Sequence, residues 1–579
     1  MIYVTAFLLF LKHSGKSVHK KLIRIHLACL NSGDTVKKSI KQRYLTSAFI
    51  LLLATVVVKI ISAFYKIPLT AYIGAEGRGY FSIAYNLCMP IHALTMGAFP
   101  IALTKLVSSY DAKGDIMKIK ALRKASKRLF LIIGLIGLGV MVIFAKPYAN
   151  LISSSPKSIY TILALAPSVF FSCIGASHRA FAEGFLDMKA TALSQLLEAL
   201  IKMIFGLLFA KYTMSSLYEF YLINGTVFGV NMADEGEALS AIYPLTSAAA
   251  MLGVTLGSIA AYFCAMIYTN SKYGSFPGER ADVKSAYNEL LMFSASLVGA
   301  TVVQSLSNFL DTSSIQYFLS LCSESALKAE YSYNGDDVYT YAFGIYATVL
   351  DFRNLVPSIV MALGVSAVPA VSAAYENSSQ RFSSLLTSIF KYASVLSVAG
   401  GLVLALFGSE ILSIFYSASH PDIVENAKTL MFYTGVFILP FALATTTVYS
   451  VQALGFAKST IPAFIISGVL RIGANYLLIT NDSININGTA LSTFIGFFAI
   501  VIMNLVTIKK KTNARISCFN VFVKPVFCGT IVYYAVQYIK SGRDLSLLQL
   551  MLLAVLCVLI YSILLILTKT VSFKDKIKA

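Results

Sequence analysis

The sequence has 579 residues, of which 57% are hydrophobic and 13% are charged, and its mean hydropathy is +0.74. A soluble protein carries about twice that share of charged residues, so the composition excludes a string of soluble domains and indicates one polytopic membrane protein. The formal net charge is +20. Such an excess can indicate nucleic-acid binding, but its placement along this chain argues against that ligand.

The predicted elements begin with a basic segment over residues 1–44, whose single apolar run is too short to cross a bilayer. We expect this segment to be a cytoplasmic arm. Between Leu45 and Leu567, apolar stretches long enough to span a membrane recur, and we count fourteen predicted helices. They are centred near residues 55, 91, 137, 168, 200, 254, 305, 358, 404, 440, 470, 498, 532 and 557. The predicted fold class is therefore an all-α polytopic membrane protein.

The loops between these spans divide the charge unequally. Loops on one side hold 34 of the 47 Lys and Arg residues, whereas the opposite loops hold nine. The basic loops are residues 12–45, 105–128, 179–189, 270–288, 376–391, 451–460, 509–524 and 568–579. Because basic loops stay in the cytoplasm, this pattern predicts a plasma-membrane protein with both termini cytoplasmic. The charge is thus explained by topology, and we expect no nucleic-acid partner.

An internal repeat relates the two halves of the chain. A constant offset of 269 residues pairs Pro100 with Pro369, Lys189 with Lys458, and Lys202 with Arg471. Six spans separate the copies, and because six is even the halves share one orientation, with the substrate site expected between them. We expect an N-lobe over residues 45–269, a C-lobe over 270–508, and two further helices with a basic tail over 509–579.

Several ionisable side chains fall within predicted spans, where a charge is costly and by default suggests function. Asp351 and Arg353 in the stretch "VLDFRNLVP" lie two residues apart, point to different faces of a helix, and each require another partner. Lys59 and Lys66 are seven residues apart on one face of the first span. For Lys66, a side chain that reaches toward the membrane surface is the structural alternative to a binding role.

Polar side chains also mark the seventh and eleventh spans. Gln304, Asn308 and Asp311 form a stripe along one face of the seventh, which can either hold helices together or line a cavity. Arg471 in the eleventh has Asn475 one turn on and lacks an acidic partner within its own helix. Arg353 and Arg471 are therefore the leading candidates for anion-binding cations.

In the fifth span, Glu198 precedes Lys202 by four residues, the favourable order for an intrahelical ion pair that eases insertion or takes part in coupling. The eight cysteines and six histidines show no metal-ligand spacing, so we expect no metal and no disulfide. No catalytic grouping or nucleotide-binding loop is apparent, so we expect neither an enzyme nor a cofactor. Any work must come from an ion gradient, the membrane potential or the substrate's own gradient.

Five stretches, in order along the chain, carry a family resemblance. They are "ISAFYKIPLTAYIGAEGRGYFSIAYNL", "HRAFAEGFLDMKATALSQLLEALIK", "NFLDT", "VQALGFAKSTIPAFIISGVLRIGANYLL" and "NINGTALSTFIGF". The chain resembles polysaccharide exporters of the stage V sporulation protein B type. These are relatives of the MurJ lipid II flippases in the MOP superfamily, which also contains the MATE antiporters.

The resemblance implies two six-helix lobes around a central cationic cavity, with the last two helices forming a groove for a polyprenyl tail. Lys66 lies where MurJ-type proteins carry a functional arginine on the first helix, and Arg353 looks like the arginine of their eighth span. The sequence departs from MurJ in the second span, where His92 is the nearest residue to an arginine pair. With substrate absent, Asp351 and Asp311 are expected to hold the cations.

The leading expectation is a flippase that moves an undecaprenyl-pyrophosphate-linked cell-wall precursor or polysaccharide unit across a bacterial plasma membrane. Such a protein serves peptidoglycan synthesis or sporulation; we expect a monomer that contacts membrane lipids and uses a monovalent coupling ion. The first alternative is a MATE-like cation or drug antiporter, which favours acidic lobes. The second is an integral-membrane glycosyltransferase or ligase, which would use the acidic outer loops at 234–237 and 336–337.

Overall fold

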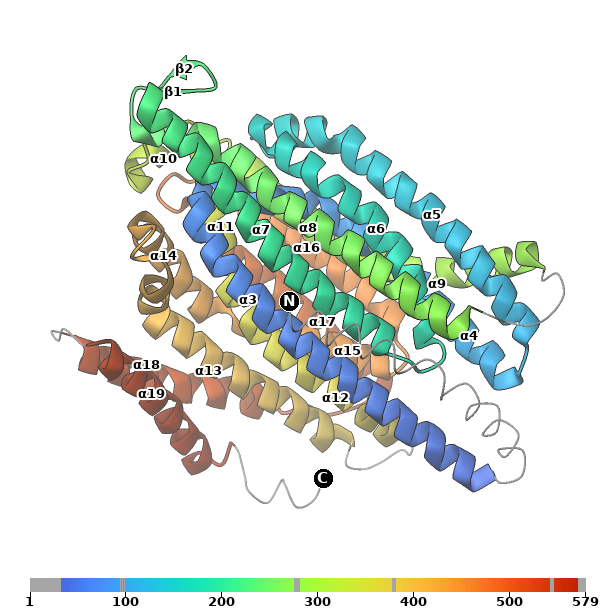
Figure 1. Ribbon diagram of the computed structural model, residues 1–579. Coiled ribbons are helices and arrows are strands. Elements are labelled where there is room, and N and C mark those ends of the chain that lie inside the picture. The colour runs from blue at the N-terminus through green and yellow to red at the C-terminus, as the bar shows by residue number, and fades with distance from the viewer. Residues whose placement is uncertain are drawn as a thin grey trace.

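The computed structural model describes residues 33–93, 95, 97, 99–274, 282–376, 382–541 and 546–570. Its helices run side by side along one common direction, as Figure 1 shows. Most of the predicted N-terminal arm (residues 1–32) and the end of the C-terminal tail lie outside the described residues. The all-α polytopic fold class is confirmed.

The elements follow in chain order. The α-helices are α3 (Gly33–Ala93), α4 (Phe99–Lys113), α5 (Ile116–Pro147), α6 (Ile159–Glu183), α7 (Lys189–Asn224), α8 (Glu235–Tyr273), α9 (Val283–Leu319), α10 (Glu324–Tyr331), α11 (Val338–Arg353), α12 (Leu355–Glu376), α13 (Phe382–Tyr416), α14 (Pro421–Phe437), α15 (Leu439–Ala453), α16 (Thr460–Ile479), α17 (Gly488–Thr512), α18 (Lys524–Lys540) and α19 (Leu547–Leu567). One hairpin, β1 (Thr226–Val227) with β2 (Val230–Asn231), is antiparallel.

Each of the fourteen predicted span centres falls within one of these helices. By length and apolar composition, eleven helices within the described residues could cross a membrane, or twelve if α14 and α15, bent by 45°, form one span. Two predicted spans merge into the single long helix α3, and α9 is not among the eleven. The count of fourteen therefore stays a prediction.

The long helix α3 contains a break at Gly74, whose φ of 62° and ψ of −172° are not helical. Glycine adopts a positive φ without the steric cost of a side chain. A Cβ added here would also lie 3.0 Å from the Tyr243 hydroxyl on α8. This break separates the first and second predicted spans.

Helices α3 and α11 join the two halves of the chain at one end of the bundle. They cross closely, because a Cβ added at Gly344 on α11 would lie 1.7 Å from the Ala75 carbonyl oxygen on α3. Small residues permit such an approach between membrane helices. The hairpin and α10 mark this same end, at the upper left of Figure 1.

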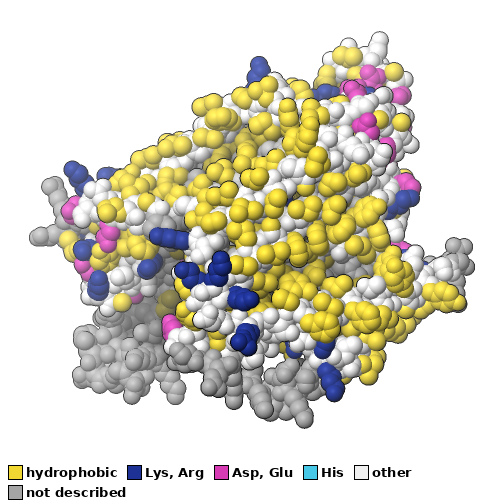
Figure 2. All heavy atoms as spheres, turned by 180° about the vertical axis from the view of Figure 1, so that it is seen from behind, with side chains coloured by type: hydrophobic (Ala, Val, Ile, Leu, Met, Phe, Trp, Pro, Cys, Tyr) yellow, Lys and Arg dark blue, Asp and Glu magenta, His cyan; other side chains and the backbone are white. Residues whose placement is uncertain are grey.

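The surface has the distribution expected of a membrane protein. Figure 2 shows a broad belt of hydrophobic side chains, with acidic side chains at both ends and most visible Lys and Arg at the end away from the hairpin. Exposed hydrophobic side chains include Ile143 on α5, Leu208 on α7 and Leu477 on α16. At the edge of the bundle, α18 and α19 pack on α13 through a separate apolar cluster that includes Leu406, Val532 and Tyr561.

Candidate functional site

A cavity of about 450 Å³ lies in the C-terminal half, and we name it the C-terminal cavity. Residues of α9, α11, α12, α15, α16 and α17 line it. It brings together five residues singled out from the sequence: Gln304, Asn308, Asp311, Arg353 and Arg471. The polar stripe on the seventh span lines this cavity and also bonds α9 to α16, so both roles considered for it are present in the structure.

Arg471 and Asp311 form a buried ion pair in this cavity, with side-chain exposures of 7% and 2%. The Asn475 side-chain amide donates to the other Asp311 oxygen at 3.0 Å, and an Arg471 nitrogen donates to the Asn308 oxygen at 3.4 Å. Two donors to one carboxylate offset part of the cost of removing its charge from water. Arg471 therefore has no acidic partner on its own helix and pairs with Asp311 on α9. This agrees with the expectation that Asp311 holds one of the cations.

Arg353 has a different environment. Among the described residues, no carboxylate lies within 4.0 Å of its guanidinium. The guanidinium lies 4.9 Å from the centre of the Phe441 ring and donates to the Thr493 hydroxyl at 3.5 Å, while its Nε is buried without a hydrogen-bond partner. The expectation that Asp351 or Asp311 holds Arg353 is wrong, because both acids are engaged by other cations.

Asp351 joins the two halves of the chain. One of its carboxylate oxygens binds Lys66, and the other accepts from Arg78 Nη2 at 2.5 Å, both on α3. The Arg78 side chain is 2% exposed, and its Nε and Nη1 lack partners. One carboxylate thus balances two cations, which leaves a net positive charge at the contact between α3 and α11.

Arg78 was missed by the sequence analysis, which counted it only among the nine basic residues of the opposite loops. Two features of the sequence could have identified it. Asp351 requires a cationic partner, and Arg78 is an arginine flanked by long apolar runs. The local break at Gly74 obscured that signal, because helical spacing cannot be carried across a non-helical residue.

The remaining predicted residues lie apart from the C-terminal cavity. Lys59 is exposed on α3, and His92 is half-buried near the end of the same helix. Within the described residues Glu198 forms no ion pair with Lys202 inside 4.0 Å. Instead the Lys202 ammonium lies 5.1 Å from the centre of the Tyr65 ring. The predicted intrahelical pair is therefore not formed, because a cation–π contact takes its place.

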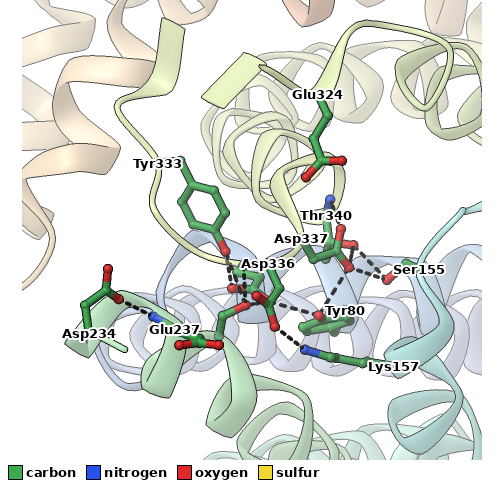
Figure 3. A network of polar contacts seen from close by, with 12 residues as sticks. Tyr80, Ser155, Lys157, Asp234, Glu237, Glu324, Tyr333, Asp336, Asp337 and Thr340 are labelled. Carbon is green, nitrogen blue, oxygen red and sulfur yellow. Dashed lines mark hydrogen bonds and ion pairs between the residues drawn. The ribbon is translucent and has the colours of Figure 1, made fainter. Parts of the chain in front are cut away.

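At the hairpin end, a polar network joins α3, α8 and α11 (Figure 3). The Tyr80 hydroxyl lies 2.9 Å from a Glu76 oxygen and 3.2 Å from an Asp337 oxygen, and Ser240 on α8 donates to Glu76 at 2.9 Å. Tyr333 also donates to Glu76. These contacts hold the two halves together on the side that the charge pattern predicts to be outside.

Asp337 closes this network from the C-terminal half. Its carboxylate accepts the Thr340 backbone N–H at 2.9 Å and the Ser155 hydroxyl at 3.1 Å, which caps α11 and anchors the segment before α6. Burial raises the pKa of Asp337 above its ordinary value. Its neighbour Asp336 binds Lys157 at 3.2 Å. The outer acids thus stabilise helix starts and contacts between segments.

An apolar groove of about 490 Å³ lies between α13, α14, α15, α17 and α18. Its walls include Leu402, Phe432, Phe498 and Tyr533. Of the last two helices, which the family resemblance predicts to form a groove for a polyprenyl tail, α18 lines this groove, whereas none of its lining residues comes from α19.

Known proteins resemble this chain in sequence and in fold. Residues 44–233 match the family described as "Polysaccharide biosynthesis protein". Lipid II flippase MurJ of Bacillus subtilis (strain 168) is 23% identical over 489 residues, covering 81% of this chain and 83% of MurJ. Stage V sporulation protein B of the same organism is 23% identical over 513 residues, covering 87% and 91%.

The chain is therefore similar in sequence to MurJ and stage V sporulation protein B over most of its length. A solved structure of MurJ in an inward closed conformation has a TM-score of 0.63 at 18% identity and covers 92% of this chain and all of MurJ. An inward-facing MATE transporter of the MOP superfamily has a TM-score of 0.58 at 14% identity, covering 79% and 98%. The chain therefore has the fold that these MurJ and MATE structures share, and the resemblance seen in its sequence is confirmed.

Proposed function

We propose that this MurJ relative moves an undecaprenyl-pyrophosphate-linked cell-wall precursor or polysaccharide unit across the bacterial plasma membrane by alternating access. The N-lobe (45–269) and C-lobe (270–508) rock about the substrate, and the last helices (509–579) guide its tail. Both termini lie in the cytoplasm, and the protein acts as a monomer without catalysis. Its partners are the lipid-linked substrate, membrane lipids and a monovalent coupling ion.

The observation that carries the proposal is the environment of Arg353. Its guanidinium faces a cavity beside the Arg471–Asp311 pair, and no carboxylate of the described residues lies within 4.0 Å of it. The Arg353 side chain is half-buried, and its Nε has no hydrogen-bond partner among the described residues. Planar guanidinium groups fit phosphate by paired hydrogen bonds. Two arginines against one aspartate leave the cavity with a net charge of about +1, which suits the pyrophosphate of a lipid-linked sugar.

The apolar groove beside α18 supports the same substrate class. A polyprenyl chain is a long hydrocarbon, and the groove walls are formed by aliphatic and aromatic side chains. A lipid-linked sugar needs an apolar path for its tail and a cationic one for its headgroup. The C-terminal half offers both.

The contact between α3 and α11 suggests how the lobes are coupled to substrate. Asp351 holds Lys66 and Arg78 of the opposite lobe. A pyrophosphate that reaches these cations competes with the carboxylate, so substrate binding weakens the bond between lobes. The network around Glu76 and Asp337 keeps the outer side shut until that exchange takes place. Transport then consists of an exchange of protein carboxylate for substrate phosphate.

The direct test is depletion of the protein followed by identification of the lipid-linked intermediate that accumulates on the cytoplasmic leaflet. We expect an undecaprenyl-pyrophosphate sugar to accumulate there and to be cleared when the wild-type protein is restored. An unchanged lipid-linked pool, together with altered efflux of cationic drugs, would contradict the proposal and support an antiporter.

The antiporter is the second candidate, because a MATE transporter shares the fold. The cavity charge favours the flippase, since a cation carrier requires acidic groups that are not already paired and Asp311 is engaged by Arg471. The glycosyltransferase alternative relied on the outer acids. Two of these, Asp234 and Asp337, cap the starts of α8 and α11 instead.

A further inference from the structure

A second large cavity, of about 760 Å³, lies in the N-terminal half between α4, α6 and the start of α7. We name it the N-terminal cavity. None of the site residues predicted from the sequence lines it. It adjoins the loops at 105–128 and 179–189, which the charge pattern places in the cytoplasm.

The two cavities occupy equivalent positions in the predicted repeat. Five residues that line the N-terminal cavity fall, at the offset of 269, on residues that line the C-terminal cavity. Among these pairs are Arg179 with Val448, Glu183 with Gln452, and Gln195 with Phe464. The offset was obtained from other positions, so the agreement between the cavities is independent of them. Because each half has a cavity at the equivalent position, we expect both cavities to bind a ligand.

Charge within the N-terminal cavity is supplied by Arg179, Lys105 and Glu183. Arg179 is 5% exposed, and its guanidinium donates to the Ser172 carbonyl oxygen at 3.5 Å, a long hydrogen bond. Within the described residues, no carboxylate lies within 4.0 Å of it. Glu183 instead accepts the Thr191 hydroxyl at 2.5 Å. A buried arginine in this setting lacks the acidic partner that normally offsets its desolvation.

The balance of two cations against one carboxylate gives this cavity a net charge of about +1, the same as in the C-terminal cavity. Lys105 lies on the exposed side of α4, with its ammonium 4.6 Å from the centre of the Phe293 ring, so it can reach a ligand at low cost. Hydroxyls of Ser108 and Ser109 on α4 also line the cavity. Arginine, lysine and hydroxyl donors together form a recognition set for phosphate oxygens.

We propose that the N-terminal cavity is a second anion site, which binds a phosphate ester through Arg179 and Lys105. This site is independent of Arg353, and it goes beyond the proposed function because it does not require the lipid-linked sugar as its ligand. The phosphate belongs either to a soluble phosphate ester or to an anionic lipid headgroup. Both sources are present at a cytoplasmic membrane surface, and the two arms of the test separate them.

The test uses the full-length protein and two probes. In detergent, the first arm titrates glycerol 3-phosphate and follows heat of binding and thermal unfolding. In nanodiscs, the second arm compares phosphatidylglycerol with phosphatidylcholine by native mass spectrometry. We expect saturable binding in one arm, weakened about tenfold or more in Arg179→Gln, because this variant removes a charge-assisted hydrogen bond to the phosphate. The arm that gives this signal identifies the source of the phosphate.

Two further variants make the result decisive. Lys105→Gln changes an exposed side chain, so it preserves the fold and should still weaken binding severalfold even if Arg179→Gln does not fold. Arg353→Gln changes the other cavity and should leave this binding intact. Saturable binding that is equal in wild type, Arg179→Gln and Lys105→Gln would overturn the proposal, as would no binding in either arm. Loss of binding in Arg353→Gln alone would overturn it too, while leaving the proposed function standing.

Discussion

Asp351 and Arg353 lie two residues apart on α11, yet they have separate environments. Asp351 binds Lys66 and Arg78 of α3, whereas Arg353 faces the C-terminal cavity beside Phe441. The separation follows from helical geometry, because residues at i and i+2 point to different faces. One short stretch therefore supplies both a bond between the halves and a cation for ligand binding.

The buried Arg471–Asp311 pair gives the first prediction. Arg471→Met leaves Asp311 buried without its cation, so we expect a loss of about 3–5 kcal/mol of stability. Adding Asp311→Asn should recover most of that loss, because no buried charge then remains. Thermal unfolding of the two single variants and the double variant in detergent measures the coupling. Additive losses would show that the pair does not form.

The close crossing of α3 and α11 gives the second prediction. In Gly344→Ala the new Cβ would lie 1.7 Å from the Ala75 carbonyl oxygen, so the helices must separate. We expect a loss of about 1–3 kcal/mol, typical of an overpacked contact, together with reduced transport. Gly139→Ala is the matched control, since a Cβ there meets nothing within 4 Å. Equal melting temperatures for Gly344→Ala and this control would disprove the crossing.

The third prediction concerns the pH dependence of stability that arises from Asp187, in the loop between α6 and α7. Burial alone would raise the pKa of Asp187, but hydrogen bonds from Lys272, Tyr268 and Tyr273 bring that pKa below its ordinary 3.8. Because the folded-state pKa is lowered, this carboxylate stabilises the fold above pH 3.8 and loses that effect as the pH falls through its folded value. We expect Asp187→Asn to melt lower than wild type at pH 7.

The difference between wild type and Asp187→Asn should persist down to about pH 4 and shrink only below it. Lys272→Gln serves as the partner control and should reproduce the loss at pH 7, since it removes the same ion pair. Melting curves across pH 3 to 8 provide the measurement. A difference that disappears already near neutral pH would mean that another group is responsible.

The fourth prediction concerns which loops lie outside the membrane and which lie in the cytoplasm. In a background without the eight native cysteines, single cysteines at Asp234 and Asp336 should react with an impermeant thiol reagent added outside. Cysteines at Lys120 and Lys510 should react only after the membrane is made permeable. Outside labelling at Lys510 would break the count of fourteen spans and the cytoplasmic placement of both termini.

Much of this architecture could be predicted because apolar runs of bilayer length are the strongest signal in a sequence. The stripe of Gln304, Asn308 and Asp311 was also visible, since helical spacing is local. The choice of partner could not be predicted, because it depends on which helices meet. Asp311 on α9 binds Arg471 on α16, and Asp351 on α11 binds Arg78 on α3, beyond the break at Gly74.

The N-terminal cavity was missed for a related reason. Arg179 lies in the last two turns of α6 but was counted as the first residue of the predicted cytoplasmic loop 179–189, where a basic residue is expected from topology alone. Only its burial at 5% exposure and its place in a cavity distinguish it from an ordinary loop charge. Local sequence patterns carry no information about burial at a helix end.

The central claim is that Arg353 binds the substrate phosphate in the C-terminal cavity. Its most direct test is the transfer of a fluorescent undecaprenyl-pyrophosphate sugar in proteoliposomes, expressed per folded molecule. Wild type, Arg353→Lys and Arg353→Ala are compared, with melting temperature recorded for each. Arg353→Lys keeps the charge but loses the planar pair of donors, so it separates charge from geometry.

We expect Arg353→Ala to retain the wild-type melting temperature, because within the described part of the chain the guanidinium forms no ion pair that the variant would break. Its transfer rate should fall by about tenfold or more, while Arg353→Lys gives an intermediate rate. Transfer at the wild-type rate by a well-folded Arg353→Ala protein would contradict the claim and remove this residue from the mechanism.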